Sequence, residues 1–390
     1  MIVKNWAFAL SMLSISTAIV AADQPSDINQ KKSNIPIGVT SQPTEVITPP
    51  VAPNVTHGAD IFVSADFIYW YAQQDGLSYA FAGEFGNNTT NKKPSDSQIK
   101  QLDRKWEPGF KLGAGLEFEH DGWDLFAEWT WLNPITKNKS SSSENLENEN
   151  YFVLPYDSSG IQTKAVGIPG ISLIKEEASW TLHYNVLDLE LGRNFFLSRY
   201  MTLRPHIGLK TAWINQKFNQ EFLSDDLAFT NAGQFPSLSD TKTFTFSGTG
   251  KKNQSLESWG LGIRMGIDPV FHLSRNWGIY GNLALSALYQ YYKTSEKVSA
   301  YGIGTGIDDL LQPIDFQLRN TKKSNHTVMP VLELALGMEY MAWFYNESYM
   351  LQIKAGWEEQ VWFNTSQFQD VSDQGNLTLQ GFTFKAGLHF

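Results

Sequence analysis

Cysteine is absent from all 390 residues of this sequence. Its absence excludes disulfide bonds, thiol chemistry, cysteine-bound zinc and a lipid-modified cysteine at the amino terminus. Lysine and arginine form no long run either, and the formal net charge is -10. Because a nucleic-acid-binding protein needs a basic surface, we expect no nucleic-acid partner.

Long apolar segments are also scarce, and the single candidate lies at the amino terminus. Lys4 gives a positive start, residues 6–20 are mostly apolar, and residues 20–22 (Val-Ala-Ala) form a small-residue cleavage site. We therefore assign residues 1–22 to a signal peptide that is cleaved after Ala22. No later run approaches the ~18 apolar residues of a membrane-spanning helix. The exported chain is then either soluble or a membrane barrel.

Charged residues are few, at 18%, compared with roughly 25% in an ordinary soluble domain. Aromatic residues are abundant at 14%, and there are 30 glycines and 13 tryptophans. This composition is typical of a membrane barrel, because aromatic rings gather at the two interfaces and glycine fits crowded lumen positions. A secreted β-sandwich or propeller has a similar composition, so the decision depends on the pattern along the chain.

Residues 23–58 are polar, rich in proline and almost free of aromatic residues. Such a segment cannot bury enough apolar surface to offset the entropy lost on ordering. We expect an extended periplasmic linker that acts as a spacer; an arm that contacts the cell wall or a partner is the alternative. Residues 59–390 form the third predicted segment.

This third segment alternates between apolar and polar residues with a period of two, which predicts β-strands. In the clearest stretch, residues 109–119, one face is apolar and the other carries glycine, lysine and glutamate, and Asp121-Gly122 then predicts a hairpin turn. Ten strands are expected at 61–71, 109–119, 123–131, 180–191, 201–213, 259–268, 277–291, 332–340, 349–357 and 382–390. In 180–191 the apolar residues change face, and a β-bulge near Asn185 would explain this change.

The connections between these strands alternate in length. Short turns are expected at 120–122, 193–200, 269–276 and 341–348, and long connections at 72–106, 133–179, 214–255, 292–327 and 359–377. Short periplasmic turns and long extracellular loops are typical of outer-membrane barrels. We predict an all-β, transmembrane, antiparallel up-and-down β-barrel. Weaker alternating pieces at 77–82, 216–222, 242–247 and 361–368 extend strands or add new ones, so at least ten strands are expected and twelve to sixteen remain open.

The apolar face of this barrel must point to lipid and the charged face to the lumen. By this parity the acidic lumen residues are Asp66, Glu117, Glu119, Asp124, Glu128, Asp188, Glu190, Asp268, Glu333, Glu339 and Glu358. The basic ones are Lys111, Arg204, Lys210, Arg264, Lys354 and Lys385, and His206 also faces inward. The acidic excess favours a weak preference for cations. The alternative is that these charges pair across strands and hold the barrel closed.

The segment ADFIYWYAQQDGLSYA (65–80) resembles the first-strand signature of the Legionella-type major outer membrane protein family, a pore-forming family also found in chlamydia-like bacteria. Residues 105–132 and 204–210 are similar to the same family. The resemblance implies an outer-membrane porin, is compatible with a homo-oligomer, and supplies no catalytic residues. Chlamydial major porins are rich in cysteine, whereas this chain has none. The terminal Phe390 resembles the signal that the barrel-assembly machinery reads.

We therefore expect a bacterial outer-membrane porin, surrounded by lipid, that passes ions and small hydrophilic solutes by passive diffusion without a cofactor or metal. A surface barrel that acts through its extracellular loops, as an adhesin or structural protein, is the alternative. An enzyme is disfavoured, because no HExxH or GxSxG motif is present and the glycine-rich 302–309 segment suits a flexible loop. A transporter of hydrophobic compounds is disfavoured because 23–58 is too polar to form an apolar hatch.

Overall fold

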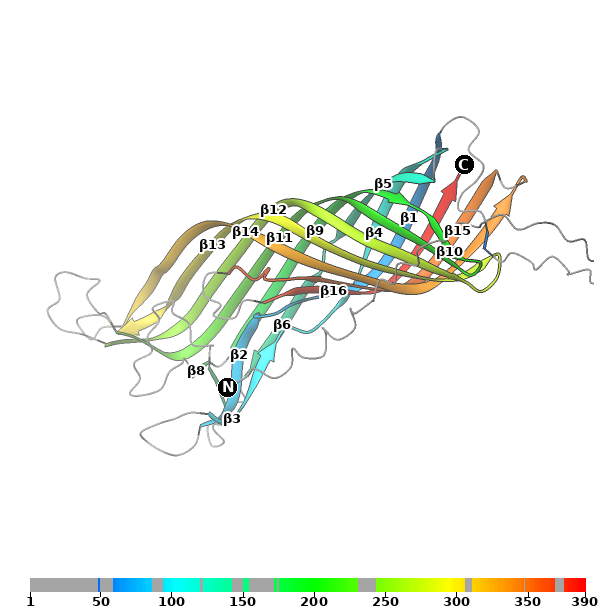
Figure 1. Ribbon diagram of the computed structural model, residues 1–390. Helices are drawn as coiled ribbons and strands as arrows, with labels where there is room; N and C mark the ends of the chain where they lie inside the picture. Colours follow the sequence, from blue (N-terminus) through cyan, green and yellow to red (C-terminus); the bar gives the residue numbers. More distant parts are fainter. Residues whose placement is uncertain are drawn as a thin grey trace, which may run out of the picture. The chain divides into compact units, whose positions relative to one another are not determined.

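The computed structural model describes residues 48–49, 59–85, 94–119, 122–141, 150–153, 172–173, 175–230, 243–305, 311–346, 348–368 and 375–390. All regular secondary structure in these ranges is β-strand (Figure 1). They contain no helix of the length and hydropathy needed to cross a membrane. The chain divides into two units, Met1–Glu45 and Val46–Phe390, and every described residue belongs to the second.

Ten antiparallel strands form a closed barrel, which confirms the expected fold. In the order in which they pair, they are β11 (Met201–Thr230), β12 (Thr243–His272), β13 (Trp277–Thr305), β14 (Leu311–Phe344), β15 (Tyr349–Trp362), β16 (Leu377–His389), β1 (Ala59–Gln74), β4 (Trp106–Phe118), β5 (Trp123–Leu132) and β9 (Lys175–Arg193). β9 pairs with β11, which closes the ring. A closed ring leaves no unpaired strand edge in lipid, where unsatisfied backbone groups cannot be tolerated.

The first and last strands of the barrel meet at a seam. β1 and β16 pair without interruption from Phe62↔His389 to Gln74↔Leu377. The backbone groups of Ile61 and Phe390 exchange hydrogen bonds of 3.1 and 3.0 Å. The predicted signal peptide and linker, apart from Thr48 and Pro49, lie outside the described residues, so their boundaries stay predictions.

Six shorter strands lie outside the barrel ring. β2 (Ser78–Phe85), β3 (Pro94–Gln101), β7 (Asn150–Val153) and β8 (Ser172–Leu173) form a separate sheet, while β6 (Ile135–Ser141) pairs with β9 and β10 (Phe195–Ser198) with β11. The weak alternating piece at 77–82 therefore belongs largely to this second sheet and adds no barrel strand.

Two of the expected long connections, 214–255 and 292–327, are mostly strand. β11 and β12 pair as far as Thr230↔Thr243, and β13 and β14 as far as Thr305↔Leu311. The weak alternating pieces at 216–222 and 242–247 therefore extend strands, which is one of the two outcomes expected of them, whereas the prediction of a long connection was wrong for most of 292–327. Outward residues such as Lys217 and Lys251 are polar, because the strand has left the lipid there and no longer has an apolar outer face. The start of the glycine-rich 302–309 segment, up to Thr305, likewise belongs to β13 and is not loop.

The β-bulge expected near Asn185 is absent. The pairing of β9 with β11 runs without a shift from His206↔Gly192 to Leu223↔Lys175. Trp180 and Tyr184 are buried inside the barrel, whereas Leu189 points outward and is 40% exposed. The apolar residues change face because the barrel interior itself changes from charged to apolar along the strand.

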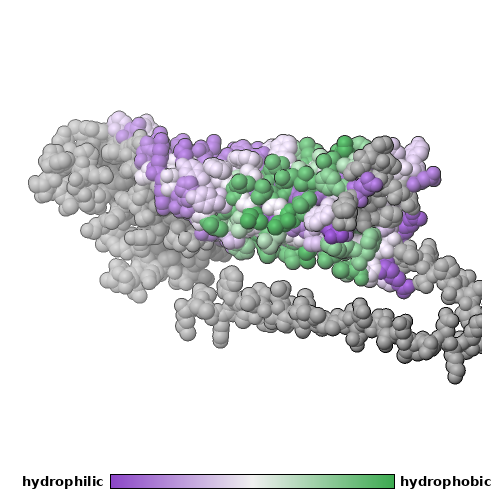
Figure 2. Space-filling model, turned by 45° about the horizontal axis from the view of Figure 1, so that its top comes forward, coloured by the Kyte–Doolittle hydropathy of each residue, from purple (hydrophilic) through white to green (hydrophobic). Residues whose placement is uncertain are grey.

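The outer surface carries the apolar belt that lipid requires. Figure 2 shows a hydrophobic band with hydrophilic residues towards both ends. Residues of this band include Leu336, Ile207 and Ile263, which are 65%, 56% and 55% exposed. Such exposure would be costly in water and is favourable in hydrocarbon, so the predicted orientation, with the apolar face to lipid, is confirmed.

Candidate functional site

The charged lumen residues surround a cavity of about 290 Å³ at the end of the barrel that carries the short turns. We call this cavity the chamber. Its wall takes residues from every barrel strand, from Asp66 on β1 to Lys385 on β16. Pro49, from the segment before β1, also lines it. The inward parity of the strands explains the chamber, because polar side chains at alternate positions of each strand point to the same interior.

One group of chamber charges, here called the arginine cluster, joins three cations to five carboxylates. Arg204 lies 2.5 Å from Asp124, 2.8 Å from Asp268 and 3.2 Å from Glu190. Arg264 pairs with Glu190 and, at 2.6 Å, with Glu333. Lys210, only 1% exposed, lies 2.8 Å from Asp188 and 2.6 Å from Glu333.

A second group, here called the lysine cluster, consists of Asp66, Lys111, Glu128, Glu358 and Lys385. Lys111 Nζ donates to Glu358 Oε2 at 2.6 Å and lies 3.6 Å from Glu128. Lys385 Nζ lies 3.3 Å from Glu128 and 3.9 Å from Asp66. Lys354 with Glu339, at 3.2 Å, and His389 with Glu117, at 2.9 Å, form separate pairs.

Several of these ion pairs cross the lumen between strands that are not neighbours. Lys111 is on β4 and Glu358 on β15, with β16 and β1 between them; Lys210 is on β11 and Glu333 on β14. Such bridges tie distant walls together. Removing one partner of a buried ion pair leaves the other partner as an uncompensated buried charge, which destabilises the fold.

Above the chamber, apolar and aromatic side chains fill the lumen. Ile68, Trp70, Leu132, Tyr184 and Trp362 are all 0% exposed and belong to one buried cluster. We call this cluster the apolar layer. Polar atoms within it are paired across the interior: Tyr184 Oη donates to Gln360 Oε1 at 2.7 Å, and Gln216 Nε2 donates to Gln74 Oε1 at 3.0 Å.

The inward glycines Gly113 and Gly115 make room for the rings of Phe126 and Phe62. A Cβ atom at Gly113 would lie 2.5 Å from Ser64 Oγ and 2.6 Å from the ring of Phe126. At Gly115 the same atom would overlap the ring of Phe62. A larger residue at either position would therefore have to displace a packed side chain.

Beyond the apolar layer, the barrel extension also buries a carboxyl group. Glu176 on β9 is 0% exposed, and it accepts a hydrogen bond of 3.3 Å from Gln220. Burial raises the pKa of Glu176 to about 8, although the Gln220 hydrogen bond and Lys252 act in the opposite direction. The Glu176 carboxyl lies outside the lipid-facing band of the barrel, because its neighbours on the strand, Lys175 and Glu177, are charged and point outward.

Comparison with known proteins identifies the relatives of this barrel. Residues 51–390 match the family model described as "Legionella pneumophila major outer membrane protein precursor". The chain belongs to this family. Membership confirms the resemblance found in the sequence and places the protein in the bacterial outer membrane. No curated protein sequence matches it.

Solved structures give only weak matches to this member of the major outer membrane protein family. The Pseudomonas putida toluene transporter TodX is 10% identical with a TM-score of 0.24, and the match covers 88% of this chain and 92% of that one. Ail, the attachment invasion locus protein of Yersinia pestis, is 11% identical with a TM-score of 0.20, covering 86% and 100%. A Pseudomonas aeruginosa FadL homologue is 9% identical with a TM-score of 0.21, covering 87% and 92%. These similarities are too low to carry an argument about function.

The lumen residues predicted for this major outer membrane protein occupy three kinds of position. Most line the chamber: Asp66, Lys111, Glu117, Asp124, Glu128, Asp188, Glu190, Arg204, Arg264, Asp268, Glu333, Glu339, Lys354, Glu358 and Lys385. His206 and Lys210 point inward but are buried, at 5% and 1% exposure. Glu119 lies just after the end of β4 and is exposed, because the strand has already ended at Phe118.

The apolar layer of this family member was not predicted from the sequence. Its residues are apolar and point inward, whereas only polar residues were expected in the lumen. A usable signal was present in 68–72, where both faces of the strand are apolar or aromatic. A strand with two apolar faces is buried on both sides. One of these faces contacts lipid and the other the packed interior.

Proposed function

We propose that this protein is a porin-type channel for ions and small hydrophilic solutes, with the chamber as its vestibule and the apolar layer as its closed constriction. The observation that carries the proposal is the chamber, a charged cavity at one end of a closed membrane barrel. Passage through the lumen then requires the apolar layer to move or to be wetted, as in hydrophobic constrictions that gate by excluding water.

The chamber carries more carboxylates than cations, which supports a weak cation preference. Its lining includes ten acidic side chains and five basic ones, with Lys210 buried behind them. Because most charges are engaged in pairs, the preference comes from the surplus and not from a ring of free carboxylates. The same pairing argues for transport over catalysis, since the carboxylates and cations are already held by one another.

A second candidate function follows from the filled lumen. Strands β11–β14 are 29 to 34 residues long and continue past the lipid-facing band, and the interior of this extension is also packed. A closed barrel with a tall rim suits a surface protein that acts through its extracellular face. Under this alternative the chamber charges serve only to hold the walls together.

Assembly and oligomerisation belong to the same proposal. The last strand pairs with both neighbours, and Phe390 is 43% exposed at its end. We propose that this strand is the segment which the barrel-assembly machinery reads. A homo-oligomer through the lipid-facing belt is compatible with the fold.

Single-channel recording decides between the two functions. The folded protein, refolded in detergent, is inserted into a planar bilayer with a salt gradient across it. Stepwise openings with a reversal potential of the sign expected for cations support the channel. A folded barrel that passes no current at any voltage contradicts the channel proposal and favours the surface-barrel function.

A further inference from the structure

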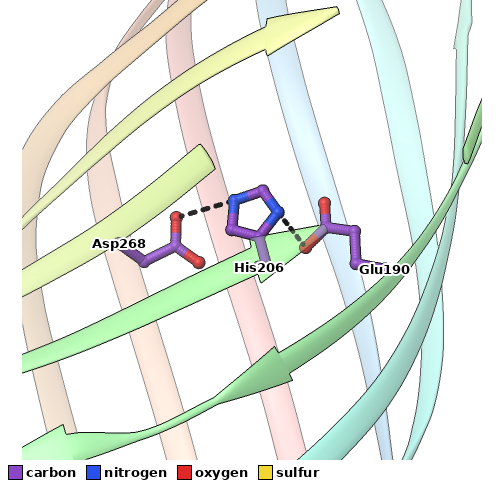
Figure 3. Close-up of side chains that lie close together, drawn as sticks. All are labelled: Glu190, His206 and Asp268. Carbon is purple, nitrogen blue, oxygen red and sulfur yellow. Dashed lines mark ion pairs between the residues drawn. The ribbon is translucent and has the colours of Figure 1, made fainter. Parts of the chain in front are cut away.

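Glu190, His206 and Asp268 project into one corner of the barrel interior from the neighbouring strands β9, β11 and β12 (Figure 3). Each offers one ligand-type atom, and the three atoms lie within 4.8 Å of one another. His206 Nδ1 is 3.4 Å from Glu190 Oε2, and His206 Nε2 is 3.7 Å from Asp268 Oδ1. A metal ion binds only one of the two ring nitrogens. One ring nitrogen and one oxygen of each carboxylate lie within 4.8 Å of one another, compared with about 3.4 Å between donor atoms on a tetrahedral zinc ion, so binding draws the three side chains closer together.

One atom of this group is buried without a hydrogen bond. His206 Nε2 has no hydrogen-bond partner among the described residues, although the side chain of His206 is 0% exposed. His206 Nδ1 lies 3.4 Å from Glu190 Oε2 and 3.5 Å from Arg264 Nη1. In the tautomer that carries its hydrogen on Nδ1, facing Glu190, the Nε2 lone pair points towards Asp268. A buried nitrogen that has no hydrogen bond and points towards a carboxylate can take a cation between the two groups.

The ring is held in this position by its neighbours on the strands. A Cβ atom at Gly266, opposite His206 in the register, would lie 2.6 Å from Nε2 and 2.8 Å from Cε1. Glycine is therefore required there for the imidazole to reach Asp268. Asp268 is the most accessible of the three, because its side chain is 26% exposed. An ion in the chamber therefore reaches the group at Asp268.

The charges around the three residues also favour a cation. The arginine cluster contains five carboxylates and three cations, which leaves two negative charges uncompensated when His206 is neutral. Uncompensated charge is costly in a buried position. One divalent cation balances it.

We propose that Glu190, His206 and Asp268 form a binding site for a divalent transition-metal ion of the zinc type. The mixed imidazole and carboxylate donors suit zinc and its first-row neighbours better than calcium, which prefers oxygen ligands alone. Arg204 is the natural competitor, because its guanidinium contacts both Glu190 and Asp268. The metal takes the place of Arg204 on these two carboxylates, and Arg204 keeps its contact with Asp124.

Zinc titration of the full folded chain in detergent, followed by calorimetry and by elemental analysis after gel filtration, tests this site. We expect one zinc ion per chain. His206→Gln weakens zinc binding by about tenfold or more, and Arg204→Gln strengthens it by about tenfold, because a competing positive charge is gone. His272→Gln is the matched control: His272 is also buried in the chamber and its Nδ1 also lacks a hydrogen bond, but it belongs to no group of three metal-ligating side chains among the described residues, so its loss leaves zinc binding unchanged.

Every variant is first checked for folding by its heat-dependent mobility on a gel. The proposal is overturned if the folded wild type binds no zinc, or if His206→Gln binds zinc as the wild type does. Calcium that binds as tightly as zinc also overturns it, since this shows a general acidic chamber. The titration involves no membrane current, so the metal site and the proposed channel can fail separately.

Discussion

At the scale of the residue, Arg264 shows how much depends on a single buried charge. Its guanidinium contacts Glu190, Asp188 and Glu333, and its side chain is 8% exposed. We expect Arg264→Met to lower the free energy of unfolding by about 3–5 kcal/mol, because three carboxylates lose a common partner. Urea unfolding in detergent measures this change.

Lys251 provides the control for Arg264. It also forms an ion pair, at 3.3 Å from Glu221, but both side chains are more than half exposed, at 53% and 55%. Lys251→Met should therefore change the free energy of unfolding by about 0–1 kcal/mol. Equal effects of the two substitutions would contradict the structural role assigned to the arginine cluster.

Glu176 predicts a dependence of stability on pH. Its pKa is about 8 in the folded barrel, compared with 4.5 for a solvent-exposed glutamate. Between these values the unfolded chain has released a proton that the folded chain keeps, so the free energy of unfolding falls as pH rises from 4.5 to about 8. Glu176→Gln should reduce this decline, measured as the urea midpoint at several pH values. An unchanged slope would exclude Glu176 as its source.

At the scale of the strand, β15 places two tryptophans on opposite faces. Trp362 is 0% exposed in the apolar layer, and Trp357 is 44% exposed on the lipid side. We expect Trp362→Ala to raise single-channel conductance, because it opens a cavity in the constriction, and to cost about 3–5 kcal/mol of stability. Trp357→Ala should leave the conductance at the wild-type level. Identical recordings from both variants would exclude the layer as the barrier.

The lipid-facing halves of the strands were predicted well from the sequence, because every outward residue that contacts lipid must be apolar. Leu189 on β9 and Leu336 on β14 point outward as expected. Where the strands leave the lipid, the rule no longer applies. The extensions of β11 and β12 were therefore predicted only as weak alternating pieces, and those of β13 and β14 and the apolar layer were missed. Outward residues of the extensions are polar, and inward residues such as Phe218 are apolar.

The candidate site was predicted in part for a similar reason. Parity along one strand is enough to place Glu190, His206 and Asp268 on the lumen side. It does not show which of them meet, because this depends on the stagger between neighbouring strands. His206 lies opposite Gly192 on β9 and Gly266 on β12, a register that only the folded barrel reveals.

At the scale of the whole molecule, closure of the ring depends on the last strand. A chain that ends before Leu377 lacks β16 and leaves unpaired edges on both β1 and β15. We expect this truncated chain to lose the heat-dependent gel mobility and protease resistance of a closed barrel. Removal of residues 1–45, which form a separate unit, should preserve both properties. A resistant, truncated barrel would show that the ring closes in another way.

The seam between β1 and β16 also sets an order of events in biogenesis. Ile61 meets Phe390 only after the whole chain has been exported, so both edges stay open throughout translocation. Joining such distant ends carries a loop-closure entropy, and pairings of this kind form slowly. During that interval the exposed edges invite pairing with other chains. We therefore expect a periplasmic escort that shields these edges to raise the yield of correctly closed barrels in the cell.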